Sequence, residues 1–429
     1  MFNLTLDWDI PNHLDRKRPQ THFLRARLTP TVQAGRGLPT RMAIALDVSS
    51  SMGSENKLAR AKEALLAVVR QLRPEDRLSV AAYSGTVTPL FDGIAGGPGA
   101  VRRAEEALAR LSAEGITRMD LALDWLGRAV PDTAGTVRVA ILITDGEPTT
   151  AKGVVLTEAA DLDGIKERGH RLRSSGLSLW ALGLGNPSDF NGAFLEDIAP
   201  GGFMLAADPA TLSARLQHRL SEAQSMATEG MRLIVRPLMD GAKAKAFCRI
   251  APTYAPLDMP SAAGAPVFAG PAASGGPTDY LIEFEVPPPP MAAPMLGGRP
   301  ASTPADVALV RIESADGRFS AEQKAVIIYT ASVSESQKRD REVDQARLLW
   351  EMNLCGQKAT SSTDRNATRE FFVQMAVAAE QAGRPDVAVA AKENVQELDK
   401  SGDISKRRTT ELFGLMRDDI LPRKPDDRK

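Results

Sequence analysis

Apolar residues in the first half of the chain recur in two alternating patterns. Mainly apolar runs at 42–46 and 138–144 are typical of strands that are buried on both faces of a parallel sheet. Between them lie segments such as 57–72, in which apolar residues recur every three or four positions and predict a helix. Because strands and helices alternate over residues 41–228, we predict an α/β domain whose sheet is doubly wound and mostly parallel, with Rossmann-like topology.

A different pattern follows this domain. Residues 229–333 contain strand-like segments with no helical segment between them, and 13 of the 29 prolines lie between positions 252 and 304. Proline cannot donate a ladder hydrogen bond, so this density indicates exposed loops. We predict a flanking antiparallel β domain that is sandwich-like and has Pro-rich loops. Residues 1–40 also contain strand-like segments, which we expect to pack with this later β domain.

The C-terminal part of the chain has helical periodicity. Segments at 370–382 and 385–398 form a predicted helix pair that is broken at Gly383. We predict a helical region over 334–420. We expect the last residues, 421–429, to form a disordered tail.

Composition and charge narrow the functional classes. The 429 residues include 53 basic and 54 acidic side chains, so the overall charge does not favour nucleic acid. Cys248 and Cys355 fit a reducing compartment, and the four histidines are scattered without the spacing of a zinc site. The start of the chain is unlike a signal peptide, and no stretch approaches the roughly 20 apolar residues of a membrane span. We therefore expect a cytoplasmic protein with no membrane span and no nucleic-acid partner.

Side chains with hard oxygen atoms follow the predicted central strands. Asp47, Ser49 and Ser51 come at alternate positions from the end of the first buried strand. Thr117 lies in a loop that opens a helix, and Asp145 directly follows another buried strand. Because the carboxyl ends of parallel strands meet at the edge of the sheet where α/β proteins bind ligands, we expect these residues to lie close together. Mg²⁺ prefers oxygen ligands, so the pattern predicts a divalent-cation site.

The motif Asp47-x-Ser49-x-Ser51, with Thr117 and Asp145, resembles the metal-ion-dependent adhesion site of von Willebrand factor type A domains. The resemblance covers a little under half of the chain. It implies that Ser49, Ser51 and Thr117 bind a metal through their hydroxyls, and that Asp47 and Asp145 bind it directly or through water. It also implies Mg²⁺, with Mn²⁺ or Ca²⁺ as alternatives, and a coordination position left open for a Glu or Asp of a protein partner.

Loop residues around this site are candidates for contact with the partner. They are Ser50, Met52, Gly115, Arg118, Glu147 and Asp189. For Glu147 and the segment around Asp189, the simpler alternative is a solvated loop or turn.

The β-rich flank, the A-type domain and the helical C-terminus together resemble bacterial intracellular A-domain proteins, which frequently act beside AAA+ ATPases, kinases or phosphatases. The resemblance implies a component of an intracellular multiprotein complex that binds an acidic partner side chain through its metal. The sequence has no P-loop or nucleophile elbow, and no histidine in the site loops, so we expect no enzymatic activity. Two alternatives stay open: a constitutive scaffold that binds through its C-terminal helices with a structural metal, and a metal-dependent phosphohydrolase.

Overall fold

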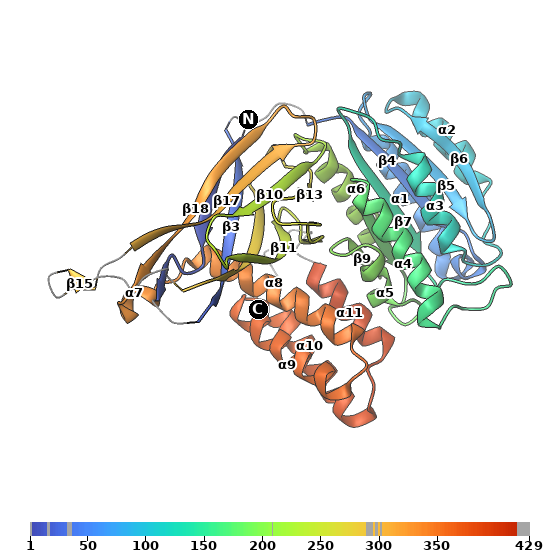
Figure 1. Ribbon diagram of the computed structural model, residues 1–429. Coiled ribbons are helices and arrows are strands. Elements are labelled where there is room, and N and C mark those ends of the chain that lie inside the picture. The colour runs from blue at the N-terminus through green and yellow to red at the C-terminus, as the bar shows by residue number, and fades with distance from the viewer. Residues whose placement is uncertain are drawn as a thin grey trace, which may run out of the picture. The chain divides into compact units, whose positions relative to one another are not determined.

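The chain forms two compact units, whose elements are labelled in Figure 1. The computed structural model describes residues 2–14, 18–31, 37–207, 209–288, 295–296, 299–300 and 303–417. The β unit lies within Met1–Gly37, Met226–Leu354 and Val377–Arg384. The α/β unit lies within Leu38–Ser225, Cys355–Ala376 and Pro385–Lys429. The C-terminal helices are thus divided between the two units and do not form a third.

The α/β unit is built on a six-stranded sheet with the order β6-β5-β4-β7-β8-β9. The strands are β4 (Thr40–Asp47), β5 (Arg77–Tyr83), β6 (Val87–Ile94), β7 (Val137–Thr144), β8 (Ser178–Leu184) and β9 (Phe203–Ala206). All neighbours are parallel except β6, which runs antiparallel to β5 at the edge. The prediction of a doubly wound, mostly parallel sheet is confirmed. Its central strands are continuous apolar runs because both of their faces are covered.

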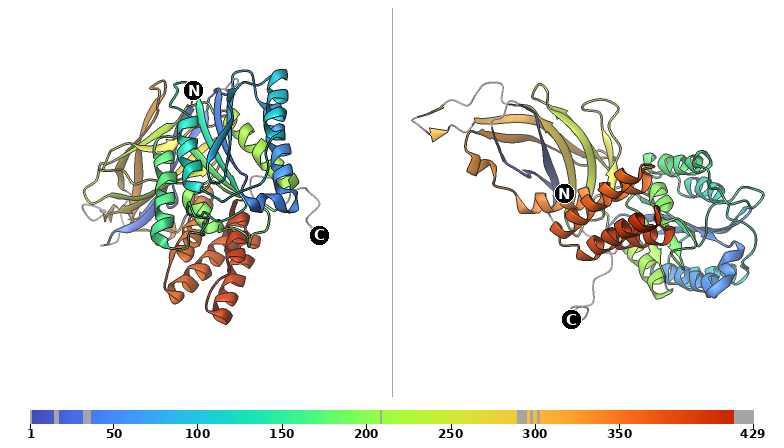
Figure 2. Two further views of the ribbon diagram at one scale, coloured as in Figure 1. Left: turned by 90° about the vertical axis from the view of Figure 1, so that its right-hand side faces the viewer. Right: turned by 90° about the horizontal axis from the view of Figure 1, so that it is seen from below.

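Helices cover both faces of this sheet (Figure 2). They are η1 (Ser50–Asn56), α1 (Lys57–Gln71), α2 (Pro98–Ala109), α3 (Met119–Ala129), α4 (Ala159–Ser174), α5 (Gly192–Ile198) and α6 (Pro209–Gln224). Helix α1 packs beside α6, and α3 packs beside α4. The strand order reverses between β4 and β7, which are followed by helices on opposite faces. A topological switch point of this kind is where α/β folds bind ligands, and both Asp47 and Thr144 end their strands there.

The β unit is a sandwich of two five-stranded sheets. The first has the order β1 (Phe2–Trp8), β3 (Gln20–Pro30), β14 (Thr278–Val286), β11 (Lys243–Ala251) and β12 (Ala255–Leu257). The second has the order β13 (Val267–Gly270), β10 (Met231–Pro237), β17 (Thr303–Ser314), β18 (Ser320–Thr330) and β2 (Asn12–Leu14). The N-terminal strands lie in these sheets, because β3 pairs with β14 and β2 pairs with β18. A separate pair is formed by β15 (Met295–Leu296) and β16 (Arg299–Pro300).

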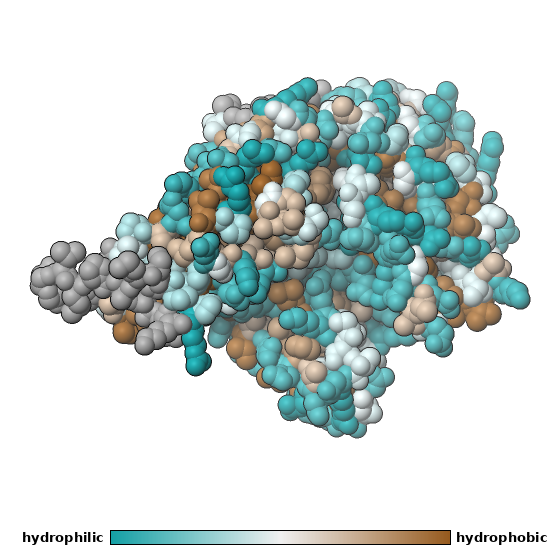
Figure 3. Space-filling model, in the orientation of Figure 1, coloured by the Kyte–Doolittle hydropathy of each residue, from teal (hydrophilic) through white to brown (hydrophobic). Residues whose placement is uncertain are grey.

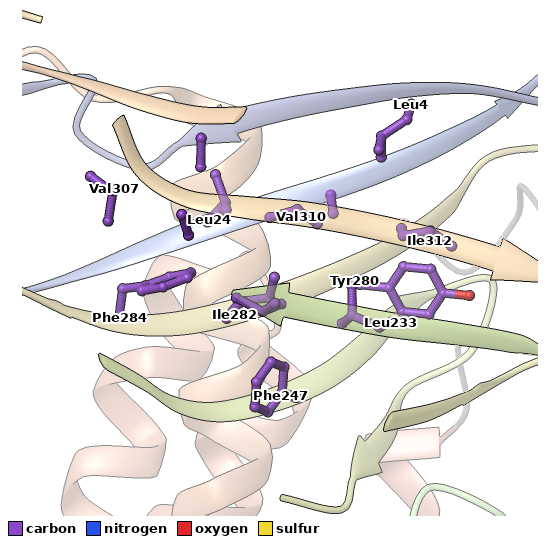
Figure 4. Packing of buried hydrophobic residues seen from close by; sticks show 14 of the residues in the cluster. Leu4, Leu24, Leu233, Phe247, Tyr280, Ile282, Phe284, Val307, Val310 and Ile312 are labelled. Atoms are coloured by element: carbon purple, nitrogen blue, oxygen red, sulfur yellow. The ribbon is translucent and has the colours of Figure 1, made fainter. Parts of the chain in front are cut away.

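The two sheets of the sandwich enclose one apolar core (Figure 4). Along β14, every second residue points into it, so Tyr280, Ile282 and Phe284 are fully buried. Leu24 of β3, which is in the same sheet, and Val310 of β17, which is in the opposite sheet, belong to the same core. Burying one such side chain contributes about 2 kcal/mol, so this core is a major source of the stability of the β unit.

The C-terminal helices follow the last strand of the sandwich. They are α7 (Val333–Ser336), α8 (Arg341–Ser361), α9 (Arg365–Gln381), α10 (Pro385–Ser401) and α11 (Lys406–Arg417). Gly383, with a φ of 74°, makes the predicted break between α9 and α10 in a left-handed conformation that favours glycine. Within the α/β unit, α11 packs on α5 and β9. The predicted tail at 421–429 lies outside the described residues.

Apolar and hydrophilic residues are intermixed on the face shown in Figure 3. Within the part of the chain that the structure describes, every helix is too short or too polar to span a membrane.

Asp76 joins β4, α6 and the loop after α1 in the α/β unit. Its buried carboxylate accepts hydrogen bonds from the backbone N–H of Thr40 at 2.9 Å and of Arg73 at 2.9 Å. It also accepts from the Arg73 guanidinium at 3.0 Å and from Gln224 Nε2 at 2.7 Å. Replacing Asp76 by asparagine is expected to lower the free energy of unfolding by about 3 kcal/mol, because Arg73 loses its closest and most buried counter-charge. Urea unfolding measures this loss, with the exposed Asp132→Asn as a control expected to cost less than about 1 kcal/mol.

The effect of Asp76→Asn should depend on pH. Burial raises the pKa of Asp76, but hydrogen bonds from Arg73, Thr40 and Gln224 outweigh it and lower the pKa below the ordinary 3.8. The stabilisation is therefore complete above the unfolded-state pKa and is lost as the pH falls through the lower folded-state pKa. The difference between the wild type and Asp76→Asn should shrink as the pH is lowered to about 3. A difference that stays constant over this range would contradict the assignment.

Candidate functional site

The carboxylate of Asp47 is fixed at the end of β4. The residue is fully buried. Its Oδ1 accepts a hydrogen bond from the backbone N–H of Ser49 at 2.8 Å, and its Oδ2 accepts one from the Thr144 hydroxyl at 2.9 Å. Burial raises the pKa of Asp47 to about 6, and the charge of Asp145 adds to this rise. The ionised form is therefore unfavourable unless a cation approaches it.

The two serine hydroxyls connect Asp47 to the second carboxylate. Ser49 lies next to Asp47 in the same turn, and its Oγ is 3.1 Å from Ser51 Oγ. Ser51 Oγ in turn donates to Asp145 Oδ1 at 2.7 Å. The structure thus brings four of the five predicted ligands into one hydrogen-bonded group.

Thr117 faces the same group from the loop before α3. Its backbone is held by Thr149, whose Oγ1 accepts from Thr117 N–H at 3.0 Å and whose N–H donates to Thr117 C=O at 2.9 Å. A Cβ placed on Gly146 would lie 3.7 Å from Ser51 Oγ and 3.9 Å from Thr117 Oγ1. The hydroxyls of Ser51 and Thr117 therefore both border the space that the missing side chain of Gly146 leaves.

These five residues are chemically suited to a hard cation. They provide two carboxylates and three hydroxyls, which are ligands that Mg²⁺ and Ca²⁺ prefer. The hydroxyls matter for this fit, because the described residues contain no group of three or more His, Cys, Asp or Glu that could hold a metal. A cation here would depend on the loop geometry that brings the serines and Thr117 to the carboxylates.

Most of the residues predicted to contact a partner lie on loops around this group. Ser50 donates from its N–H and its hydroxyl to the carbonyl of Gly115, at 3.2 Å and 3.1 Å, which ties the two loops together. Gly115 has a φ of 86°, which favours glycine at this turn. Arg118 forms a two-pronged pair with Asp120, at 2.9 Å and 2.7 Å.

The structure corrects one predicted contact residue. Met52 is fully buried, because η1 turns its side chain into the core beneath the site. It cannot contact a partner, and we remove it from the contact surface. By contrast, the side chain of Asp189 is 43% exposed.

Lys57, the first residue of α1, also belongs to this group, although its pattern in the sequence did not predict it. Its side chain is only 6% exposed, and its Nζ donates to Asp145 Oδ2 at 3.0 Å and to Asp189 Oδ2 at 3.3 Å. Glu55 and Asn56 precede it with φ values of 52° and 57°, and this left-handed turn directs Lys57 inward. The sequence contained one signal. A lysine in the first turn of a helix is disfavoured by the helix dipole, so its presence there indicates a compensating negative charge nearby.

Helix α11 contributes to the edge of the site, which was likewise not predicted from the sequence. Lys406 of this helix forms an ion pair with Glu147, one of the predicted contact residues. The Thr410 hydroxyl accepts a hydrogen bond from Gly192 N–H at 3.0 Å. Residues of α11 and of the nearby loops also line a cavity of about 340 Å³; these are Glu55, Gly185, Asn186, Pro187, Ala207, Arg407 and Glu411.

Comparison with known families identifies the domain that holds this group. Residues 42–147 match the family model described as the von Willebrand factor type A domain. The chain carries a von Willebrand factor type A domain. The matched segment of this A domain contains all five candidate ligands.

Solved structures match nearly the whole chain in fold. A von Willebrand factor type A protein from Catenulispora acidiphila aligns with a TM-score of 0.74 at 18% identity, covering 97% of this chain and 96% of that one. The ArnB paralog VWA2 from Sulfolobus acidocaldarius aligns with a TM-score of 0.60 at 16% identity, covering 98% and 99%. At these identities the likeness shows the fold, which combines an A domain with a β sandwich and C-terminal helices.

A curated relative matches part of the chain. The uncharacterized protein YfbK of Escherichia coli strain K12 is 26% identical over 208 residues, which is 48% of this chain. The match spans only 33% of the length of YfbK. A match of this extent carries no conclusion about activity.

Proposed function

We propose that this protein is a metal-dependent protein-interaction module, acting in the cytoplasm as a component of a multiprotein complex. The observation that carries the proposal is the convergence of Asp47, Ser49, Ser51, Thr117 and Asp145 at the switch point of an A domain. A domains typically bind protein partners, which makes binding the function that this geometry supports best.

In this proposal the hydroxyls of Ser49, Ser51 and Thr117 hold Mg²⁺, and Asp47 and Asp145 compensate its charge. The bound cation would supply a Lewis-acidic position for a Glu or Asp of the partner. The role of the chain itself is to orient these oxygens. Thr144 and the Ser49 N–H fix Asp47, as described above, and Ser51 fixes Asp145.

Apolar side chains beside the site suggest what else the partner presents. The turn 149–155 is anchored to Thr117 and closed by a bridge between Thr149 and Val155. On its returning arm, Val154 is 62% exposed and Val155 is 43% exposed. A partner whose acidic residue is followed by an apolar one would bury these valines when it reaches the metal.

The valines give a prediction that separates partner contact from metal binding. Val154→Asp places a negative charge where the partner's carboxylate approaches, so we expect partner affinity to fall about tenfold. The Mg²⁺ affinity should stay unchanged, because Val154 is not a ligand. Titration calorimetry with Mg²⁺ measures the metal affinity of this variant, and a binding assay with the partner measures its partner affinity. Both are measured on the same purified protein.

The proposal is tested in two steps. Titration of the purified chain with Mg²⁺ should show one saturable site. A pull-down from native lysate should then recover a partner in Mg²⁺ and lose it in EDTA and with Asp47→Asn, while Asp92→Asn on β6 keeps it. A partner that is held equally in Mg²⁺ and EDTA would refute the proposal.

The alternative of a constitutive scaffold is favoured by one observation on α9. Val373 and Val377 lie one turn apart and are 42% and 49% exposed, so they form an apolar stripe on this helix. Replacing both by lysine should abolish metal-independent binding and leave metal-dependent binding intact. Deleting the C-terminal helices is a poorer test, because Leu412 and Phe413 of α11 are buried in the α/β unit.

A further inference from the structure

Lys57 is held against the candidate metal site and is not free to leave it. Its Nζ lies between Asp145 and Asp189, and almost none of its side chain is exposed. Gly185 covers the stem: a Cβ added there would lie 2.8 Å from Lys57 Cε and 3.2 Å from Nζ. The loop after β8 therefore closes over the lysine, and the ammonium is a fixed part of the site.

The ammonium remains charged despite this burial. Its Nζ forms ion pairs with Asp145 Oδ2 at 3.0 Å and with Asp189 Oδ2 at 3.3 Å, and opposite charges at these distances favour the ionised form of the lysine. The site thus contains a permanent positive charge beside one of its two carboxylates.

This charge changes the electrostatic balance of the site. Asp47 and Asp145 alone would neutralise a divalent cation. When only the buried charges are counted, which are those of Asp47, Asp145 and Lys57, the occupied group retains one net positive charge. The negative charge of Asp189 offsets this positive charge less than a buried carboxylate would, because its side chain is 43% exposed and therefore screened by solvent.

We propose that Lys57 is a built-in cation that lowers the affinity of the site for its metal and raises the affinity of the occupied site for a carboxylate. This inference rests on the proposed function. Its positive charge competes with the metal for Asp145, because the ammonium already occupies Oδ2 of that residue. The same charge favours an acidic partner over a neutral one once the metal is bound. Lys57 is therefore a positioning and charge-setting residue and not itself a ligand.

The test compares Mg²⁺ affinities by titration calorimetry. Lys57→Met keeps the length of the side chain and removes the charge, and we expect it to bind Mg²⁺ about tenfold more tightly than the wild type. Lys57→Arg keeps the charge and should bind Mg²⁺ within about twofold of the wild type. Acetate, used as a carboxylate probe on the Mg²⁺-loaded proteins, should bind more weakly to Lys57→Met than to the wild type.

The outcomes distinguish the inference from the function on which it rests. If the wild type binds no Mg²⁺, both fail. If the wild type binds Mg²⁺ and a folded Lys57→Met binds it equally or more weakly, the inference is overturned and Lys57 only supports the loop around Asp189. Lys57→Gln removes the charge but can still donate to Asp145, and it gives the same comparison if Lys57→Met does not fold.

Discussion

Replacing Asp47 by asparagine is expected to weaken Mg²⁺ binding roughly 100-fold and, in the absence of metal, to raise the free energy of unfolding. The loss of affinity follows from removing one of only two carboxylates in the site. The gain in stability follows from the burial of that carboxylate. The two effects have opposite signs, which distinguishes a metal ligand from a residue that only supports the fold.

The expected stabilisation comes from the pKa of Asp47. Burial raises this pKa to about 6, against 3.8 for an ordinary aspartate. The charged side chain therefore costs folding free energy on the order of 3 kcal/mol at neutral pH. This cost appears as the pH rises above the unfolded-state pKa and is complete above the folded-state pKa. Asparagine avoids it and can still accept the hydrogen bond from Ser49 N–H.

Both effects are measured on purified protein, by titration with Mg²⁺ and by urea unfolding in EDTA. Asp92→Asn is the matched control, because Asp92 also accepts a serine hydrogen bond, from Ser79 Oγ at 2.6 Å, but lies on the edge strand β6. It should change neither quantity. If Asp47→Asn kept the Mg²⁺ affinity of the wild type, Asp47 would not be a ligand. If the variant were destabilised in EDTA, its role would be mainly structural.

The grouping of the site residues could be predicted from the sequence because it depends on two local rules. A continuous apolar run predicts a central parallel strand, and such strands end at the same edge of the sheet. Asp47 and Asp145 follow two of these runs, and the structure places β4 and β7 side by side. Hydrogen bonding between Ser51 and Asp145 then follows from the fold. Metal binding itself remains a prediction.

Lys57 and Met52 could not be placed in this way. The positions of both side chains depend on the path of η1. At its end, Glu55 and Asn56 adopt a left-handed conformation that their residue types do not require. This turn directs Lys57 toward Asp145, whereas the side chain of Met52 points into the core. Periodicity describes α1 well but carries no information on the turn before it.

The position of α11 shows a second limit. Its periodicity predicts a helix at 410–417, and the structure begins that helix at Lys406. Nothing in the pattern indicates its partner, because its contacts with α5 and β9 join residues about half the chain apart. Long-range docking of this kind is decided by complementary side chains and not by local propensity.

The ion pair that docks α11 gives the second large prediction. Glu196 of α5 is paired with Arg417 of α11, and their side chains are only 1% and 4% exposed. Glu196 Oε1 also accepts a hydrogen bond from Gly201 N–H at 2.8 Å. Glu196→Ala leaves the Arg417 charge buried without this partner, and we expect the free energy of unfolding to fall by about 3–5 kcal/mol. Hydrogen exchange over 406–417 should rise in the same variant, because α11 detaches.

Two further variants separate docking from general damage. Arg407→Ala removes an exposed pair with Glu411 on the same helix and should cost less than about 1 kcal/mol. The double variant Glu196→Leu with Arg417→Met removes both charges and should recover most of the stability lost in Glu196→Ala. If it recovered none, the charge pair would not be what holds α11.

Lys406, which pairs with Glu147 beside the candidate metal site, moves with this helix. Detaching α11 should therefore alter partner binding while the Mg²⁺ affinity, which depends on the loops after β4 and β7, stays the same.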